Sequence, residues 1–500
     1  MKKTLLLLMI SFVALAGCET DKKKPIVNDL PQKGSVEQGD IMIYPRSEYG
    51  YIGDPMPFSS DDRMNMFYLL DERRGSTGFH PFALLTTTNF YEWEDYGTVI
   101  PYENSISSQD LALGTGSVIQ DKDGLYHAFY TGWNARGEME WFEKIQHATS
   151  TDMITWEKHP QDGFYGAAND FRDPYVYFDE TSEEYWMLIT SRDYTGGIIK
   201  RYTSTDLVDW EYKDIFFRND DGHYNLECPT LIKYNDYYYL SFSEQGSGND
   251  RVVHYRYTDD LDKGFIKPDV DNFDGWGFYA GRIELFNSKL ILSGWVATKT
   301  ADIDQGDYMW AGHLVTHQIV QNDNGLLHVK ILDEIDQKLS NEVNYNVVDG
   351  NTVDTETQMT FLAQKGYSFI LYEELLGKAT KTEFSVDISE ASNFGITLNA
   401  YESNIGDLNV YFNIEENKLE FYKIDANQIK DARTPEISIF FNYDNITSLD
   451  CKLVTEGDVL VLYVNNERAL TSRGYNMAGS NFGFFTLNSN AVLSDVHFYE

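Results

Sequence analysis

Short stretches in which hydrophobic and polar residues alternate run through most of the chain. In the stretch His223 to Ser243, this pattern predicts a β-hairpin with strands Pro229 to Tyr234 and Tyr237 to Phe242 around an Asn235-Asp236 turn. An acidic residue, Glu227, stands just before the first strand. Units of this kind recur along the N-terminal part of the chain, which therefore consists of repeats.

Five such hairpins are each introduced by a short motif. The motifs are GDP from Gly53, GS from Gly116, RDP from Arg172, ECP from Glu227 and FYAG from Phe278. Three units continue into similar tails, TTTNFYEWED, TSTDMITWEK and TSTDLVDWEY, whose Trp93, Trp156 and Trp210 we expect to pack between sheets. A period of roughly 50 to 60 residues with about four short strands per unit is typical of a β-propeller. The sequence predicts five blades over residues 41–329.

The C-terminal part alternates again after a charged connector at residues 330–344. Its short apolar stretches, from GYSFILYEEL to GFFTLNSNAVLSDVHFY, are separated by turns such as Glu416-Asn417 and Asn465-Asn466. About eight strands of this kind favour a β-sandwich over residues 345–500. The predicted fold class is all-β, a five-bladed β-propeller followed by a C-terminal β-sandwich.

The N-terminus has the features of an export signal. Residues 1–18 comprise two lysines, an apolar run and Leu15-Ala16-Gly17-Cys18, which resembles a bacterial lipobox. We expect cleavage before Cys18, lipidation of that cysteine and a flexible tether at residues 19–40. The alternative is an ordinary signal peptide with an incidental cysteine. The lipobox favours an exported, membrane-anchored lipoprotein, either periplasmic or on the cell surface, with the lipid as its only membrane contact.

Composition narrows the classes of ligand. The formal net charge of −39 argues against nucleic acid and fits a neutral ligand. Aromatic residues make up 15% of the chain and suit stacking on sugar rings, although most aromatic side chains in any protein are core. Beyond Cys18, two cysteines imply no disulfide framework. We expect no cofactor, and the sequence contains no metal-binding or nucleotide-binding motif. The acidic composition alone does not decide whether a calcium ion binds in the propeller channel.

Three carboxylates fall at the start of the repeated hairpins. In a propeller the first strand of each blade lines the central channel, so Asp54, Asp173 and Glu227 are expected at equivalent positions around one funnel. Taken singly, these motifs also suit turns or structural ion pairs. Together, they suit glycoside hydrolysis, which needs one ionised carboxylate and one protonated carboxyl. The apolar neighbours of Glu227 predict a raised pKa, whereas backbone donors are expected to keep Asp54 ionised.

The motifs GDP, GTGS, RDP, ECP, GFYA and LILSGW, followed by GDVLVLYVNNERALTSRGY, resemble glycoside hydrolase family 32, which contains invertases, inulinases and levanases. The resemblance covers about Ile43 to Glu500. It implies that Asp54 is the nucleophile, that Glu227 is the acid/base and that Asp173 stabilises the transition state by binding fructose hydroxyls. It also implies retention of configuration, for which the Asp54 and Glu227 carboxyls stand about 5 to 5.5 Å apart.

Several positions depart from the family pattern around the pocket for the terminal sugar. Gly53 and Met56 replace asparagines, Leu69 replaces a glutamine, and the usual tryptophan falls near Pro81-Phe82. The residues that we expect to contact the sugar are Arg172, Ser117, His80, Trp133, Trp276, Tyr279 and Trp295.

The sequence therefore predicts a retaining hydrolase of β-fructosidic bonds in levan, inulin or sucrose. One alternative is a related five-bladed furanosidase that acts on arabinan or xylan with inversion, for which the carboxyls stand about 6.5 to 9.5 Å apart. The other is a surface glycan-binding lipoprotein without turnover. An oligo- or polysaccharide is the expected partner in all three cases.

Overall fold

The computed structural model describes residues 34–35, 42–73, 79–166, 170–219, 224–246, 248–355, 358–363, 366–373, 378–389, 393–400, 406–430, 434–475, 477 and 480–500. The predicted signal peptide, Cys18, His223 and most of the tether lie outside these residues. The described part is all-β apart from short helical segments, and its α-helix is α1 (Asp333–Lys338). Within this part, none of the helices has the length and apolar character needed to cross a membrane.

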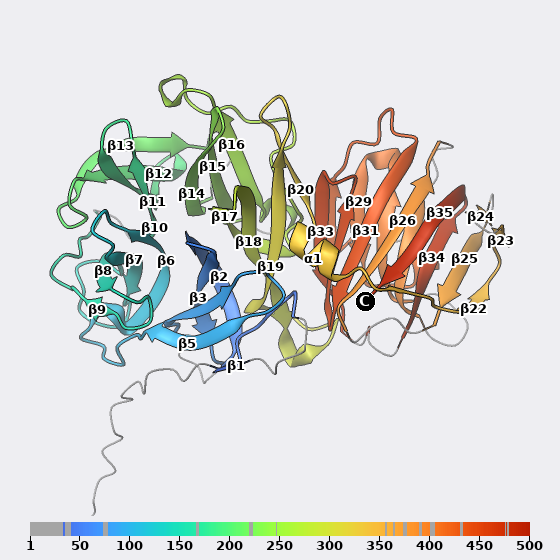
Figure 1. The fold of residues 1–500 in the computed structure, drawn as a ribbon, viewed down its shortest axis with the longest axis horizontal. Helices are drawn as coiled ribbons and strands as arrows, with labels where there is room; N and C mark the ends of the chain where they lie inside the picture. The colour runs from blue at the N-terminus through green and yellow to red at the C-terminus, as the bar shows by residue number, and fades with distance from the viewer. Residues whose placement is uncertain are drawn as a thin grey trace, which may run out of the picture.

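Antiparallel sheets make up the N-terminal region, residues 42–330, on the left of Figure 1. The strands, in chain order, are β2 (Tyr51–Ser60), β3 (Arg63–Asp71), β4 (Phe82–Thr87), β5 (Glu94–Ile100), β6 (Ala112–Gln120), β7 (Tyr126–Trp133), β8 (Glu143–Ser150), β9 (Glu157–Lys158), β10 (Phe171–Asp179), β11 (Glu184–Asp193), β12 (Gly196–Ser204), β13 (Glu211–Arg218), β14 (Leu226–Tyr234), β15 (Tyr237–Glu244), β16 (Val253–Thr258), β17 (Phe278–Phe286), β18 (Lys289–Lys299), β19 (Tyr308–Gln321) and β20 (Leu327–Lys330). The short strand β1 (Gly34–Ser35) pairs with β5. The 3₁₀ segments are η1 (Gln109–Leu111), η2 (Gly248–Asp250), η3 (Leu261–Lys263) and η4 (Thr300–Asp302).

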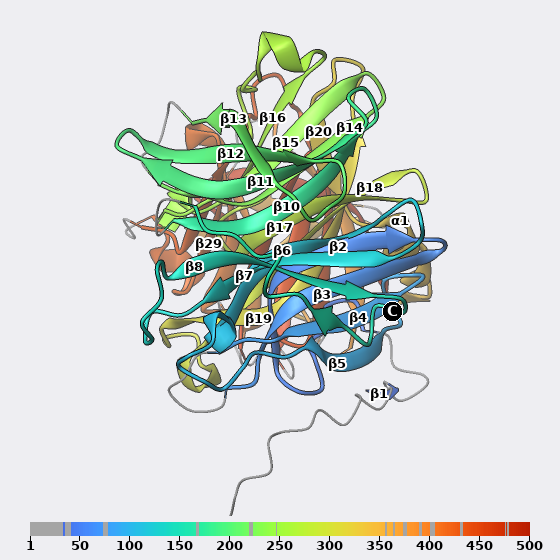
Figure 2. The ribbon, with the colours of Figure 1, turned by 90° about the vertical axis from the view of Figure 1, so that its left-hand side faces the viewer.

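The first strands of the repeats follow one another in a closed ring. Strand β2 contacts β6, β6 contacts β10, β10 contacts β14, β14 contacts β17, and β17 returns to β2. Strands β2–β5 and β17–β20 are part of one nine-stranded sheet, but β2 and β19 are joined only through the pair Ile52–Gly312. Figure 2 shows these sheets from the side away from the C-terminal region. This arrangement is consistent with the predicted propeller.

Each of these first strands contains a β-bulge at its start. Between Gly53 and Met56, β2 has one more residue than the facing part of β3, and the same irregularity occurs in β6, β10, β14 and β17. The extra residue leaves two consecutive side chains facing the same side of the sheet, which a regular strand cannot do. In four of the bulges the second residue has a positive φ; these residues are Asp54, Asp173, Cys228 and Ala280.

The repeated tails form the turns between the outer strands. Asp152 accepts the backbone N–H groups of Ile154 and Thr155, and Asp206 accepts those of Val208 and Asp209. These side-chain caps explain why the same TSTD sequence recurs, because the acceptor must stand at a fixed offset. The packing role predicted for the tail tryptophans is confirmed, since each contacts a hydrophobic cluster in the N-terminal region; these residues are Trp93, Trp156 and Trp210.

Two sheets face each other in the C-terminal region, residues 342–500, on the right of Figure 1. One contains β21 (Glu342–Val343), β23 (Val353–Asp354), β24 (Gln358–Leu362), β26 (Thr380–Asp387), β31 (Ser448–Glu456), β32 (Val459–Val464), β33 (Arg468–Arg473) and β35 (Asn490–Tyr499). The other contains β22 (Val347–Gly350), β25 (Tyr367–Tyr372), β27 (Phe394–Ala400), β28 (Leu408–Asn413), β29 (Lys418–Tyr422), β30 (Ile437–Phe440) and β34 (Asn481–Leu487), with η5 (Ile414–Glu416) and η6 (Ala426–Gln428) in its connections. Buried side chains of both sheets form one core, as in a sandwich.

The two regions share a second hydrophobic core across their junction. It contains Ile319 and Leu327 of the N-terminal region, Val459 and Tyr463 of the C-terminal region, and Ile335 of α1. The connector predicted from its charge thus contains a helix that is packed into this core. Burying one such side chain stabilises a protein by about 1.5–3 kcal/mol, so we expect the two regions to stabilise each other.

Candidate active site

A pocket of about 530 Å³ opens at the end of the ring where the bulges lie. Residues from each of the first strands β2, β6, β10, β14 and β17 line it. The lining comprises Asp54, Leu69, His80, Ala112, Leu113, Gly114, Thr115, Thr131, Trp133, Glu143, Arg172, Asp173, Glu227, Cys228, Gln245, Arg251, Tyr279 and Trp310. The three carboxylates expected from the sequence therefore meet in one pocket.

The three carboxylates do not occupy equivalent positions, and this corrects the sequence prediction. Asp54 and Asp173 are the second residues of their bulges, where φ is +43° and +56°. In β14 that position belongs to Cys228, with φ of +53°, and Glu227 is the residue before it. Glu227 is the first residue of its bulge, and the equivalent first residue in β10 is Arg172. All three still reach the pocket because both residues of a bulge face it.

Asp54 is held by two side-chain donors. The indole Nε1 of Trp295 donates to its Oδ1 at 3.0 Å, and the Thr115 hydroxyl donates to its Oδ2 at 3.0 Å. Burial, followed by the negative charges of Asp173 and Glu227, raises the pKa of Asp54 to about 6, and the two donors oppose that shift. Asp54 is therefore ionised at neutral pH, as predicted, but side chains supply the donors in place of the expected backbone groups.

Glu227 lies between a tyrosine and an arginine. The Tyr279 hydroxyl donates to Oε2 at 2.6 Å, and Nη2 of Arg172 donates to Oε1 at 3.1 Å. Burial and then the charge of Asp173 raise the pKa of Glu227, against the opposing effects of Arg172 and Tyr279. The direction predicted from its apolar neighbours is confirmed.

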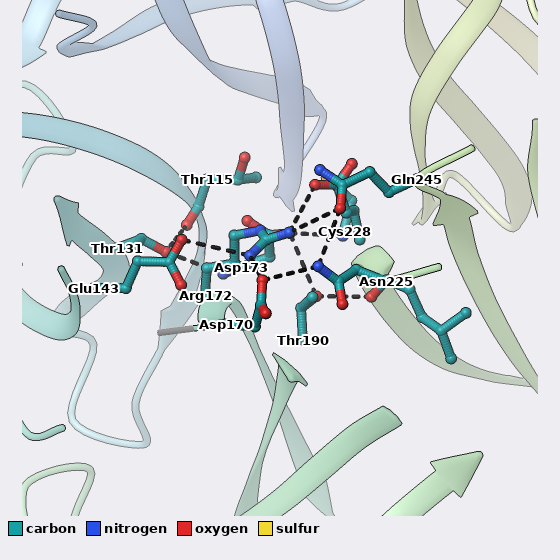
Figure 3. Close-up of polar contacts among 12 residues, drawn as sticks. Thr115, Thr131, Glu143, Asp170, Arg172, Asp173, Thr190, Asn225, Cys228 and Gln245 are labelled. Atoms are coloured by element: carbon teal, nitrogen blue, oxygen red, sulfur yellow. Dashed lines mark hydrogen bonds and ion pairs between the residues drawn. The ribbon is translucent and has the colours of Figure 1, made fainter. Parts of the chain in front are cut away.

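Asp173 is 4% exposed and is fixed by neighbouring strands (Figure 3). Its Oδ2 accepts the backbone N–H of Cys228 at 3.1 Å and the hydroxyl of Thr190 at 3.3 Å. Its own N–H donates to the Thr131 hydroxyl at 3.0 Å. These contacts tie three successive sheets together at the pocket floor and hold this carboxylate in a single orientation.

Arg172 links several acidic and amide side chains, as Figure 3 shows. Its Nη1 lies 2.9 Å from Asp170 and 3.4 Å from Glu143, and its Nη2 contacts Glu227 and Gln245. Negative neighbours, Asp173 first, raise the pKa of Arg172 against the effect of burial, so the guanidinium stays charged. Burial raises the pKa of Glu143 to about 7, which makes it a second carboxyl in the pocket that titrates near neutrality.

The remaining predicted sugar contacts divide into two groups. His80, Trp133 and Tyr279 line the pocket together with Arg172. For Ser117, Trp276 and Trp295 the structure gives other positions, and a direct sugar contact in this pocket is wrong for each.

The three exceptions have physical reasons. Ser117 faces a second cavity, where its hydroxyl accepts the N–H of Val176 at 3.0 Å. Trp276 packs against the C-terminal core and donates to the carbonyl of Glu436 at 2.7 Å. Trp295 is 2% exposed behind Asp54, so its contribution is the hydrogen bond to that carboxylate rather than stacking on a ligand.

One wall of the pocket is built around Trp310, which the sequence analysis did not single out. A Cβ at Gly53 would overlap the Trp310 ring, so the glycine is what allows the indole to lie there. His80 stacks on the same ring at 4.2 Å between ring centroids, and Leu69 is the next apolar member of the wall. The departures noted at positions 53 and 69 therefore belong to one feature, an apolar and aromatic wall.

The sequence also gave no signal for Arg251, which follows η2. Its guanidinium carbon lies 3.3 Å from the centroid of the Tyr279 ring and 5.6 Å from that of Trp295, so cation–π contacts hold it in the pocket. A loop supplies this residue, and no repeat motif marks it. Among the residues that the structure describes, no group of three or more His, Cys, Asp or Glu side chains is arranged to hold a metal ion.

Solved structures show the same fold at low sequence identity. The β-fructofuranosidase of Bombyx mori is 19% identical, with a TM-score of 0.68 over 91% of this chain and 93% of that chain. The exo-inulinase of Aspergillus awamori is 14% identical, with a TM-score of 0.68 over 91% and 96% of the two chains.

Curated relatives are similar over part of their length. Raffinose invertase of Escherichia coli is 28% identical over 247 residues, which are 44% of this chain and 50% of the relative. Sucrose-6-phosphate hydrolase of Escherichia coli is 24% identical over 314 residues, or 57% and 60%. The chain thus spans about half to three fifths of the length of these relatives. The family model for the N-terminal domain of glycosyl hydrolases family 32 matches residues 46–328, and the chain belongs to this family.

Proposed function

We propose that the protein hydrolyses β-fructosidic bonds, in fructans or sucrose, with retention of configuration through a fructosyl-enzyme intermediate. The observation that carries this proposal is the meeting of Asp54, Asp173 and Glu227 in one pocket of about 530 Å³. Membership of family 32 and the names of the similar proteins, which include an invertase and an exo-inulinase, support the choice of a fructoside.

Asp54 is the proposed nucleophile. Its carboxylate, ionised above a pKa of about 6, attacks the anomeric carbon of the fructosyl unit, and the bond to the leaving oxygen breaks. The donors Trp295 and Thr115 hold the two carboxylate oxygens in place where Asp54 lines the pocket. A nucleophile fixed in this way loses little entropy on reaching the attack geometry.

Glu227 is the proposed acid and base. Its raised pKa favours the protonated form that donates a proton to the leaving oxygen. In the second step the carboxylate takes a proton from water, the water oxygen bonds to the anomeric carbon, and the bond to Asp54 breaks. Tyr279 and Arg172 orient the carboxyl for both steps.

Asp173 and Arg172 are the proposed binding pair for the hydroxyls of the fructosyl ring. Asp173 has fixed acceptor oxygens deep in the pocket, and Arg172 remains charged beside it. A hydroxyl bound to a buried carboxylate forms a charge-assisted hydrogen bond, which is stronger than a neutral one. The wall formed by Trp310, His80 and Leu69 offers an apolar surface to the opposite face of the sugar.

The finer features of fold and location belong to the same proposal. We infer five blades, with β2–β5 and β17–β20 as two of them, because their single connecting pair, Ile52–Gly312, suits neighbouring blades. We infer the domain order expected from the sequence, with boundaries shifted by a few residues, because β20 ends at Lys330 and β21 at Glu342–Val343 already pairs with β35. The lipobox at Leu15 to Cys18 supports an exported protein anchored through lipid on Cys18.

Product release tests the proposed function. Full-length protein is incubated with levan, inulin, sucrose, arabinan and arabinoxylan beside Asp54→Ala and Glu227→Ala. Fructose released by the parent protein and by neither variant is the expected result. Arabinose or xylose release would support the inverting furanosidase instead. Binding of a glycan without any product would support the glycan-binding lipoprotein, for which the altered wall at Gly53 and Leu69 is the favouring observation.

A further inference from the structure

A second cavity, of about 260 Å³, lies further along the ring axis than the active-site pocket. Four of the first strands line it, with residues that follow their bulges, such as Met56 of β2, Ser117 of β6, Tyr175 of β10 and Arg282 of β17. None of these residues lines the active-site pocket. The cavity is therefore a separate compartment of the channel.

Arg282 dominates this compartment. Its side chain is 2% exposed, and Nη1 donates to the carbonyl of Pro229 at 3.1 Å. The other two guanidinium nitrogens, Nε and Nη2, have no hydrogen-bond partner among the described residues. An arginine side chain rarely leaves buried donors unpaired, because each unsatisfied group costs the free energy of removing it from water.

The charge of Arg282 has no carboxylate partner among the described residues, and its guanidinium carbon lies 5.9 Å from the centroid of the Tyr175 ring. Within the described residues, Arg282 forms no ion pair with the one carboxyl of this cavity, Glu284. Burial raises the pKa of Glu284 to about 8, which disfavours its charged form at neutral pH. Tyr175 directs its hydroxyl at the carbonyl of Leu231. Water can satisfy the free N–H groups, but it supplies no negative charge to a buried cation.

We propose that a small planar oxyanion of the carboxylate class binds in this cavity, with its two oxygens accepting from Nε and Nη2 of Arg282. These two nitrogens are adjacent on one edge of the guanidinium, and their parallel N–H bonds match a carboxylate in the bidentate arrangement. The Ser117 hydroxyl accepts from Val176 and keeps its own proton for a third contact with the anion. The site is independent of the proposed hydrolysis.

Occupancy of this site is expected to stabilise the ring. Arg282 belongs to β17, and its Nη1 contacts Pro229 in the bulge of β14 that carries Glu227. An anion that fixes the guanidinium therefore strengthens the contact between two neighbouring first strands. A ligand that binds the folded state alone raises the melting temperature in a saturable way.

A melting-temperature titration tests the proposal on the full-length protein. Sodium formate replaces sodium chloride at constant ionic strength, and the expected result is a saturable rise of about 1–3 °C. Arg282→Gln is expected to abolish the rise. The matched control Arg251→Gln removes an arginine from the active-site pocket instead, and this variant should still show the rise in melting temperature. An equal response to formate in the parent protein and Arg282→Gln would overturn the proposal.

A crystal structure of the unmodified protein grown in formate gives a test that does not depend on a variant. Density for a planar three-atom group bonded to both Nε and Nη2 of Arg282 is expected. Water alone at those nitrogens, or a direct contact with the Glu284 carboxylate, would overturn the proposal.

Discussion

In β10 the two residues of the bulge are Arg172 and Asp173, whereas in β14 they are Glu227 and Cys228. The backbone irregularity is the same, but the carboxylate stands at the second position in one strand and at the first in the other. The second position holds Asp173 at the floor, where it accepts the N–H of Cys228. The first position holds Glu227 beside the first-position residues of its neighbours, Arg172 and Tyr279.

This difference shows how one repeated backbone yields two kinds of carboxyl group. The first-position residues Arg172 and Tyr279 both contact Glu227 and form one tier with it. The second-position residues form a deeper tier, in which Thr115 donates to Asp54 and the Cys228 N–H donates to Asp173. Charged and phenolic side chains, Arg172 and Tyr279, donate to Glu227, whereas a backbone N–H and a threonine hydroxyl donate to Asp173. The repeat therefore fixes the location of the pocket, and the position within each bulge fixes which donors a carboxyl group contacts.

The largest effect on activity is expected from removing the negative charge of Asp54, a second-position residue. Asp54→Asn keeps the shape but removes the nucleophile, so kcat on sucrose or levan should fall by about 10⁴-fold or more. Steady-state fructose release measures this loss. The exposed turn variant Asp123→Asn serves as the matched control and should retain the parent rate. A loss of less than tenfold in Asp54→Asn would contradict the assigned role.

Replacing the two residues of the β14 bulge separately gives the next largest effect. Glu227→Gln should lower kcat by about 10²–10⁴-fold, the usual contribution of a general acid. Cys228→Ala, one residue along the same bulge, should change kcat by no more than a few fold, because its thiol has no assigned part in the reaction. If both variants lost activity equally, the assignment of the proton to the first position would fail.

The variant Asp54→Asn, which should lose activity, is expected to gain stability. Because its pKa is raised to about 6 from 3.8, ionising Asp54 costs the folded state up to about 3 kcal/mol at pH 7.5. Asp54→Asn should therefore raise the free energy of unfolding by about 1–3 kcal/mol at pH 7.5. The gain should shrink below pH 6, where Asp54 becomes protonated in the folded state. Denaturant unfolding at pH 7.5 and pH 5 checks the sign, and a larger gain at pH 5 would contradict it.

The smallest effect is expected from removing the hydrogen bond that Tyr279 donates to Glu227. Tyr279→Phe removes a donor that lowers the pKa of Glu227, so that pKa should rise further. Since Glu227 must be protonated to act, the basic limb of kcat/KM should move to higher pH, with a loss of about tenfold or less at the optimum. The pH profile of kcat/KM measures the shift. A basic limb that moved to lower pH would contradict the hydrogen-bond argument.

Much of the fold followed from the sequence because the repeats are local. The hairpin predicted at Pro229–Phe242 forms as β14 and β15, and the TSTD tails form turns around Asp152 and Asp206. The three carboxylates were found because they stand at the start of the hairpins. The register of Glu227 was wrong by one residue, because a bulge inserts one residue that alternation alone does not reveal.

The rest of the site depends on long-range packing. Trp295 and Trp276 were expected to stack on sugar, but one is buried behind Asp54 and the other contacts the C-terminal region. Arg251 and Trp310 enter the pocket from a loop and from β19, far from the motifs in sequence. The role of Gly53, which is to leave space for the Trp310 ring, depends on a contact between residues that are distant in the chain. Local patterns do not record such contacts.

The central claim, that Asp54 forms a covalent bond to the fructosyl unit, has a direct test. Glu227→Gln is mixed with β-fructofuranosyl fluoride, whose leaving group needs no acid, then quenched and digested for peptide mass spectrometry. Without its base, the second step is slow, so one fructosyl unit should accumulate on the peptide that contains Asp54. Fluoride release with no adduct, or with an adduct on another residue, would contradict the account.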